Sequence, residues 1–415
     1  MAPQPSAIEA LVVPFLERQP WYLADMAGEE AGPRGAPELV DFEVVIDGRP
    51  GLASVVLGVG DHRFHVLVGW REPALAPAAL GNHQGAVMGA CDDGLSDVLA
   101  YDALADEELS TRLLAVASGG REHAKRVRLV QSLVSHASLV YDERLFMKCY
   151  RVLEPAPRPE VELLFRLDEV GFNHLLGPVA VWERNGYDLA LVREFVPGAV
   201  EGRALALTSL RDLLARVGST DREARLDSPG SAGGDLASEM RRLGETTGRL
   251  HLALAAAFGT RPLTEGEPGY GSGPVRGAIS SAIRVHGDFH LRRVMRMDSG
   301  WILAGFGDDP LIGLSDGSVG RPRSRFASPL EDLADLWFSL HNVAGEAVQS
   351  QPSSAREAAQ RLADSWEERN AAAFLTGYLE SARIAQLVGL DRVRTESTLA
   401  ELVAQRAAGT PGPGA

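Results

Sequence analysis

Three short runs in the first part of the chain are rich in apolar residues and resemble β-strands. The turn-forming sequences DGRPG and VGD separate the runs, so residues 39–70 are predicted to form an antiparallel meander. The runs cover residues 39–47, 52–60 and 62–70. Upstream, residues 7–18 have the spacing of a short helix, which we expect Pro14 to interrupt.

The next part of the chain mixes strand and helix patterns. Residues 95–117 carry apolar side chains near helical spacing, and residues 157–171 predict an amphipathic helix entered through proline. Residues 126–153 read as two or three strands, with a turn at 141–144. Residues 178–198 predict a hairpin that turns at Asn185-Gly186.

From about residue 203 the periodicity is helical. The predicted helices cover residues 207–217, 236–259, 328–345 and 355–389. We therefore expect an α+β fold in which a β-rich lobe and a helical lobe meet at a hinge near Val196-Pro197-Gly198. The expected parts are an N-terminal cap (1–118), a small lobe with one helix (119–200), a helical lobe (201–408) and a disordered tail (409–415).

Composition and charge exclude several classes of function. A formal net charge of −15 argues against nucleic acid and against an anionic membrane surface as partners. Two cysteines, Cys91 and Cys149, give no disulfide framework. The first thirty residues lack a signal-peptide pattern, and no apolar run approaches the roughly 20 residues that span a bilayer. We expect a cytoplasmic globular protein.

Lysine is scarce in this chain. Of 41 basic residues only Lys125 and Lys148 are lysines. Lys125 lies in a run of charges, whereas Lys148 has apolar neighbours and strand-like alternation. Because lysine is a compact point charge suited to a single phosphate oxygen, Lys148 is a candidate phosphate ligand.

Three charged residues occur in the order found in phosphotransferases of the protein-kinase type. Lys148 lies on a predicted strand, Glu162 in the first turns of the next helix, and Asp288 in a His-Gly-Asp turn after the hinge. In that arrangement the lysine binds nucleotide phosphates, the glutamate holds the lysine, and the aspartate accepts the proton of the acceptor hydroxyl.

The chain resembles the bacterial maltokinases and related glucosamine-kinase-like enzymes of the aminoglycoside phosphotransferase superfamily, including their N-terminal cap. The matching segments are RQPWYLAD, SHASLVYDERLFMKCYRVLEPAPRPEVEL, EFVPGAVEG, LGETTGRLHLALA, RVHGDFH, SPLEDLADL and AAAFLTGYLESA. The resemblance implies a two-lobe protein-kinase-like fold, ATP with Mg²⁺ as donor, and a sugar or aminosugar hydroxyl as acceptor. It also implies a link to trehalose synthase or another α-glucan pathway enzyme.

The resemblance assigns roles to individual residues. It implies catalytic roles for His286, Asp288 and His290, which form the H-G-D-x-H motif. The nucleotide-binding positions that it implies are Lys148, Glu162, Ser135 and Ser138 of an S-N-T-S-like phosphate loop, and the backbone of Glu194 and Val196 near adenine. In that loop His136 and Ala137 replace the family's Asn and Thr.

The metal-binding motif departs from the family. The family's glutamine and aspartate ligands are Arg293 and Gly305 here, and neither side chain offers an oxygen. Either Asp308 or Asp309 takes the metal position, or metal binding is lost. The two hypotheses are an attenuated sugar kinase with Asp288 as base, and a catalytically inactive pseudokinase that acts as a binding or regulatory protein.

The C-terminal helix departs as well. Maltokinases carry aromatic and acidic residues there that help to hold the disaccharide. This chain keeps only Glu401 of that set, so the identity of the acceptor sugar stays open.

Overall fold

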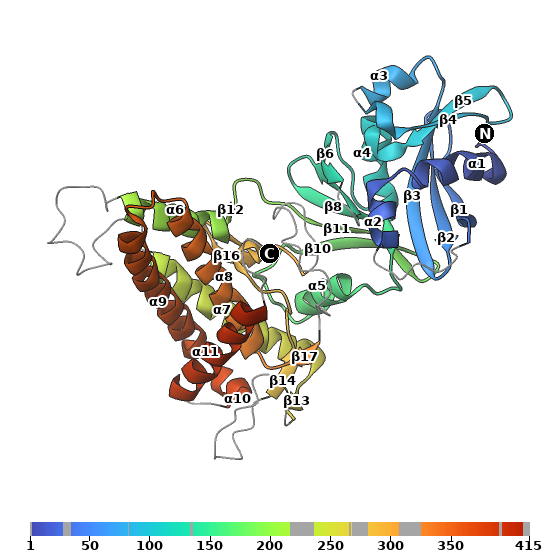
Figure 1. The fold of residues 1–415 in the computed structure, drawn as a ribbon. Helices are drawn as coiled ribbons and strands as arrows, with labels where there is room; N and C mark the ends of the chain where they lie inside the picture. The colour runs from blue at the N-terminus through green and yellow to red at the C-terminus, as the bar shows by residue number, and fades with distance from the viewer. Residues whose placement is uncertain are drawn as a thin grey trace. The chain divides into compact units, whose positions relative to one another are not determined.

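The computed structural model describes two compact units (Figure 1). Unit 1 comprises Met1–Glu162 and Gly177–Pro197, and unit 2 comprises Leu163–Leu176 and Gly198–Ala415. The described residues are 2–27, 35–81, 83–132, 136–215, 236–264, 267, 281–306, 325–389 and 392–409. The predicted boundary at residue 118 lies within unit 1 and stays a prediction, and residues 410–415 of the expected tail lie outside the described residues.

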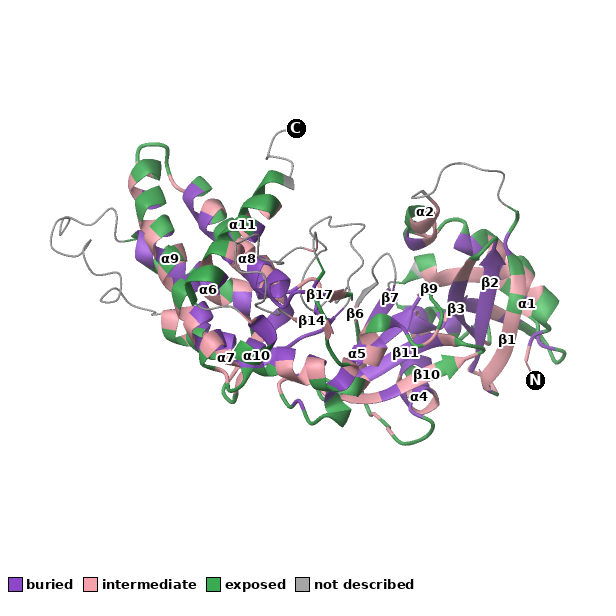
Figure 2. Cartoon of the chain, turned by 90° about the horizontal axis from the view of Figure 1, so that it is seen from below, coloured by how far each residue is buried: buried purple, intermediate pink, exposed green. Residues whose placement is uncertain are grey.

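Unit 1 begins with an antiparallel sheet in the order β1-β2-β3-β5-β4, which confirms the predicted meander. Its strands are β1 (Glu38–Ile46), β2 (Gly51–Val59), β3 (His62–Arg71), β4 (Val87–Asp92) and β5 (Asp97–Asp102), and β9 (Val152–Leu153) pairs with β3. Every residue of β2 is buried, as Figure 2 shows. Strand β2 is therefore covered on both faces, whereas Ile46 is the one buried residue of the outer strand β1.

Helix α1 (Pro5–Leu16) runs through Pro14 without a break, so the predicted interruption is wrong. Its buried residues Ile8, Val12 and Phe15 pack in one cluster with strand residues of the sheet. This packing outweighs the loss of one intrahelical hydrogen bond at proline. The sequence reading missed α2 (Pro20–Ala27) and α3 (Ala76–Leu80).

The helix predicted over residues 95–117 is half strand. Residues 97–102 form β5, which pairs with β3 and β4, and only α4 (Glu107–Ala117) is helical. Asp106 begins α4, because its carboxylate accepts hydrogen bonds from the N–H groups of Glu108 at 3.0 Å and Leu109 at 3.2 Å. The short η2 turn (Ala103–Ala105) connects the two elements.

A second antiparallel sheet of unit 1 has the order β10-β11-β8-β7-β6. Its strands are β6 (Val127–Ser132), β7 (His136–Tyr141), β8 (Leu145–Tyr150), β10 (Pro178–Arg184) and β11 (Tyr187–Glu194), and α5 (Pro159–Glu169) follows β9. The β10–β11 hairpin turns at Asn185 and Gly186, with φ of 51° and 77°, as predicted. Buried residues of α4 share one core cluster with residues of β7, β8 and β11, so this helix supports the sheet that carries Lys148.

Unit 2 is mainly helical, as the periodicity predicted. Its helices are α6 (Gly202–Leu214), α7 (Leu236–Phe258), α8 (Leu330–Gln349), α9 (Arg356–Glu380), α10 (Ile384–Val388) and α11 (Arg392–Gly409). Two small sheets complete the unit, in the orders β12-β15-β16 and β13-β14-β17. Their strands are β12 (Val200–Glu201), β13 (Arg261–Pro262), β14 (Ser281–Arg284), β15 (Val294–Met297), β16 (Gly300–Leu303) and β17 (Phe326–Ala327).

Helices α7 and α9 approach each other through glycine. A Cβ atom on Gly377 would lie 1.9 Å from the carbonyl oxygen of Arg241, and one on Gly244 would lie 2.0 Å from that of Phe374. Only glycine fits at this contact, because any Cβ would force the two backbones apart. Among the described residues, we find no helix that is both long and apolar enough to cross a membrane.

We predict that Gly377→Ala destabilises the protein by about 3 kcal/mol, because the added methyl group overpacks the α7–α9 contact. Gly345→Ala is the matched control, since a Cβ there meets nothing within 4 Å and α8 gains helix propensity of about 0.5–1 kcal/mol. Thermal unfolding measures both effects. A Gly377→Ala midpoint equal to that of the control would contradict the close approach.

Candidate functional site

Lys148 lies on β8, all six residues of which are buried. Its Nζ donates hydrogen bonds to both carboxylate oxygens of Glu160, at 3.0 and 2.9 Å. The two side chains are only 7% and 12% exposed. Lys148 is therefore held in a buried, two-oxygen ion pair with the first turn of α5.

The glutamate that pairs with Lys148 is not the one predicted. Glu162 was predicted, whereas in the structure Glu160 accepts the hydrogen bonds of the lysine. Both glutamates lie in the first turn of α5, but residues two apart on a helix point in different directions. Glu162 is half-buried on another side of the turn, and a nucleotide-binding role for it stays a prediction.

Tyr150 and Arg158 support the ion pair. The Tyr150 hydroxyl donates to Glu160 Oε1 at 2.5 Å, and the Arg158 guanidinium lies 4.0 Å from the centre of the Tyr150 ring. Burial alone would raise the pKa of Glu160, but the charges of Lys148 and Arg158 and the hydrogen bond from Tyr150 outweigh it and lower the pKa to about 2. Asp188 accepts a hydrogen bond from the Arg158 N–H at 2.6 Å, which fixes the chain just before α5.

Residues 136–138 of the expected phosphate loop are the first residues of strand β7. Ser138 lies opposite Lys148 and His136 lies opposite Tyr150, so both share the face of the sheet that carries the lysine. Ser138 Oγ is buried without a hydrogen-bond partner among the described residues. His136 is fully buried, and burial holds its pKa well below the usual value. Ser135 lies outside the described residues.

The segment predicted to meet adenine follows β11. The Glu194 N–H donates to the Gly177 carbonyl at 2.9 Å, and the Glu194 carboxylate accepts from the Gly177 N–H at 3.1 Å. The Phe195 N–H donates to the Arg144 carbonyl at 2.8 Å. Glu194 thereby closes the base of the β10–β11 hairpin, and Val196 follows at the end of unit 1.

In unit 2 the turn that carries Asp288 is held by Asp332 of α8. The fully buried Asp332 carboxylate accepts hydrogen bonds from the N–H groups of His286 at 2.8 Å and Gly287 at 2.9 Å. Burial would raise the pKa of Asp332, but the hydrogen bond and charge of His251 outweigh it and lower the pKa. Gly287 has a φ of 80°, a conformation that favours glycine at this position.

The support of Asp332 continues to α7 and α9. His251 Nε2 lies 3.2 Å from Asp332 Oδ2, and its Nδ1 lies 2.9 Å from the Tyr378 hydroxyl. With Nε2 protonated, the imidazole donates to Asp332 and accepts from Tyr378. Helices α7, α8 and α9 thus meet at one buried carboxylate.

His286 ties the turn together from within. Its Nε2 lies 3.1 Å from the Gly305 carbonyl and donates to it, and its Nδ1 accepts from the Asp288 N–H at 3.3 Å. The side chain is fully buried, and burial lowers its pKa. This geometry favours a positioning role over direct proton transfer for His286, which was predicted as catalytic.

Asp288 is paired with Arg293. The guanidinium donates to Asp288 Oδ2 from Nε at 3.1 Å and from Nη2, and His290 Nε2 lies 3.5 Å from Oδ1. The Asp288 side chain is 18% exposed. Burial would raise the pKa of Asp288, but the charges of Arg293 and His290 outweigh it and lower the pKa. Asp288 is therefore an ionised carboxylate at neutral pH.

Arg293 and Gly305, which occupy the positions of the family's metal ligands, do not fit Mg²⁺. Arg293 presents only N–H donors, and Gly305 presents only a backbone carbonyl that already accepts from His286. No cluster of three or more candidate ligands occurs within the described ranges. Asp308 and Asp309 lie outside those ranges, and their metal role stays a prediction.

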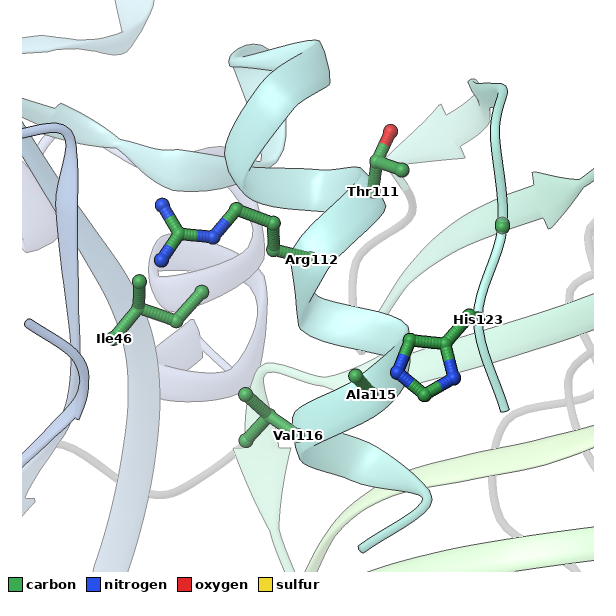
Figure 3. A pocket seen from close by; sticks show the side chains of 7 residues that line it. Ile46, Thr111, Arg112, Ala115, Val116 and His123 are labelled. Atoms are coloured by element: carbon green, nitrogen blue, oxygen red, sulfur yellow. The ribbon is translucent and has the colours of Figure 1, made fainter. Parts of the chain in front are cut away.

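Glu401 is exposed on α11, and its predicted sugar role stays a prediction. A hollow of about 310 Å³ lies beside α4 in unit 1 (Figure 3). Its lining of Ile46, Thr111, Arg112, Ala115, Val116, His123 and Ala124 contains none of the predicted site residues.

Comparisons with known proteins agree with this architecture. Three structures of glucosamine kinase match at 18% identity. The complex with glucosamine, ADP and inorganic phosphate has a TM-score of 0.58 and covers 98% of this chain and 94% of its own. Crystal form A has a TM-score of 0.54, with coverage of 96% and 98%, and crystal form B has 0.54, with 90% and 88%.

The chain is therefore an α+β protein with the two-lobe fold of kinase-like enzymes. Residues 15–106 match the family described as the maltokinase N-terminal cap domain. The cap match over these residues and the fold likeness over nearly the whole chain both agree with the resemblance predicted from the sequence.

We predict that Glu160→Gln destabilises the protein by about 3 kcal/mol at pH 7, because it leaves the buried ammonium of Lys148 without a counter-charge. Glu162→Gln is the matched control in the same helical turn and has a smaller effect. Chemical unfolding of the two variants measures the difference, and equal effects would return the assignment to Glu162.

The ion pair between Lys148 and Glu160 also predicts how the free energy of unfolding depends on pH. The pKa of Glu160 is lowered from 4.5 to about 2 in the folded state, so its contribution is complete above pH 4.5 and is lost as the pH falls toward 2. The difference in unfolding free energy between the wild type and Glu160→Gln therefore shrinks over that interval. A constant difference across it would contradict the buried pair.

Proposed function

We propose that the chain transfers the γ-phosphoryl group of ATP to a hydroxyl group of a sugar or an aminosugar. The attacking hydroxyl oxygen forms a bond to the γ-phosphorus, the bond to the bridging β–γ oxygen breaks, and ADP leaves. The hydroxyl proton passes to Asp288. The observation that carries the proposal is the geometry of Asp288, whose carboxylate lies in a glycine turn held by the buried Asp332. The charges of Arg293 and His290 lower the pKa of Asp288.

The nucleotide-binding side of the proposal rests on unit 1. Lys148 is held by Glu160, and we propose that it binds phosphate oxygens, the role that the lysine of a lysine–glutamate pair has in kinases. Ser138 adds a buried hydroxyl group on the same face. The Val196 N–H has no hydrogen-bond partner among the described residues, which supports its predicted contact with adenine.

The substrate class is supported by similarity. One matched structure is a glucosamine kinase with glucosamine and ADP, and the cap domain is of the maltokinase type. We propose an aminosugar or a small sugar as acceptor. An association with trehalose synthase or another α-glucan pathway enzyme remains a proposal that only the resemblance supports.

A second candidate function is supported by Arg293. Because its guanidinium occupies one oxygen of the predicted base, the chain is also suited to binding a sugar or a nucleotide without transferring phosphate. In that case it acts as a regulatory protein with a kinase fold. Turnover separates the two candidates.

We predict that the protein forms ADP from ATP in the presence of glucosamine, glucose or maltose, and that Asp288→Asn lowers kcat by about 10³-fold. The KM for ATP stays within about threefold, because the amide removes the proton acceptor and leaves the phosphate ligands in place. The measurement is ADP release combined with detection of the sugar phosphate.

Asp298→Asn is the matched control, because Asp298 is an exposed carboxylate ten residues further along the chain. It is expected to leave kcat unchanged. Absence of sugar phosphate with every acceptor, or a wild-type rate in Asp288→Asn, would overturn the proposed kinase activity.

A further inference from the structure

Arg293 is held rigidly at both its backbone and its side chain. It ends the short η5 turn (Leu291–Arg293) that follows the Asp288 turn. Its N–H donates to the His290 carbonyl at 2.8 Å, and its carbonyl accepts from the Ala304 N–H at 2.9 Å. The side chain is only 8% exposed. The guanidinium is therefore a buried group with a fixed position in the turn and not a mobile surface charge.

The contact with Asp288 is directed at one oxygen. Nε and Nη2 of Arg293 both donate to Oδ2, while Oδ1 faces His290 at 3.5 Å. Arginine stays protonated at any physiological pH, so the turn carries a permanent positive charge next to its carboxylate. The negative charge of the Asp288 carboxylate is thus balanced by the positive charge of Arg293 in the same turn.

A divalent cation at the same carboxylate meets two obstacles. It requires oxygen ligands, and two N–H donors already occupy Oδ2. It would also lie close to the guanidinium in a partly buried setting, where like charges repel strongly. The nearby Gly305 carbonyl does not compensate, because the His286 imidazole donates to it.

We infer that Arg293 is the built-in cation of the Asp288 turn, and that this chain binds ATP with an affinity that a divalent cation does not increase. The inference rests on the proposed function only in its first step, that the chain binds ATP. By thermodynamic linkage, Mg²⁺ strengthens ATP binding only if the complex holds the cation more tightly than ATP alone does. A turn whose carboxylate already binds a guanidinium does not supply that extra affinity.

Calorimetric titration of the full chain with ATP, in Mg²⁺ and in EDTA, tests the inference. We expect the two dissociation constants to differ by less than about threefold. Arg293→Gln replaces the guanidinium with an amide that presents one oxygen and frees Asp288 Oδ2. That variant is expected to bind ATP at least about tenfold more tightly in Mg²⁺ than in EDTA.

Two controls separate the charge of Arg293 from its packing. Arg293→Lys keeps the positive charge and is expected to remain insensitive to Mg²⁺. Arg292→Gln removes the neighbouring, half-buried arginine and is expected to behave as the wild type. Folding of each variant is checked by its thermal midpoint, and the wild-type comparison stands without any variant.

A wild-type affinity at least about tenfold weaker in EDTA would overturn the inference, as would absence of ATP binding under both conditions. The proposed function has its own outcome. ATP binding that ignores Mg²⁺ with no sugar phosphate formed would leave the inference standing and remove the kinase activity. Sugar phosphorylation together with strongly Mg²⁺-dependent ATP binding would support the kinase activity and overturn the inference about Arg293.

Discussion

The hydrogen bonds accepted by the buried carboxylate of Asp332 are the interaction on which the rest of unit 2 depends. It accepts the N–H groups of His286 and Gly287 and is in turn bound by His251, which contacts Tyr378. A carboxylate without these partners would be very costly at full burial. The fold of α7, α8 and α9 and the conformation of the Asp288 turn are thus fixed by the same hydrogen bonds. A change in helix packing would move the predicted base.

The two charged residues predicted for the site, Lys148 and Asp288, each form an ion pair with a residue of opposite charge in the same unit. Lys148 is balanced by Glu160 in unit 1, and Asp288 is balanced by Arg293 in unit 2. The first pair fixes the ammonium group of the lysine that we propose as a phosphate ligand. The second pair keeps a carboxylate ionised but occupies one of its oxygens. The Lys148 pair therefore fits the proposed kinase activity, whereas the Asp288 turn also fits a protein that binds a ligand without catalysis.

Local sequence patterns predicted much of the fold, because they involve residues that are neighbours along the chain. The meander over residues 39–70 follows from apolar runs separated by turn sequences, and the Asn185-Gly186 turn follows from residues that accept positive φ. Residues 97–102 were wrongly predicted as helix from their apolar spacing. They form a strand because they pair with β3 and β4. That pairing has no local signal.

The candidate site shows the same limit. The sequence indicated Lys148 and Asp288, but it could not choose between two glutamates in one helical turn, since α5 packing decides which of them faces the lysine. Asp332 lies 46 residues from His286 along the chain, and the quoted motif SPLEDLADL gave no role for it. The sequence showed Arg293 only as the residue that replaces a metal ligand of the family, whereas in the structure its guanidinium donates hydrogen bonds to Asp288.

The central claim is that Asp332 fixes the backbone of the Asp288 turn, and amide hydrogen exchange at His286 and Gly287 tests it most directly. In the wild type these two amides should be strongly protected, and Asp332→Asn should accelerate their exchange by at least about tenfold. Asp335→Asn, on the same helix but paired with Arg406, should leave them unchanged. Equal protection of the two amides in the wild type and in Asp332→Asn would contradict the account.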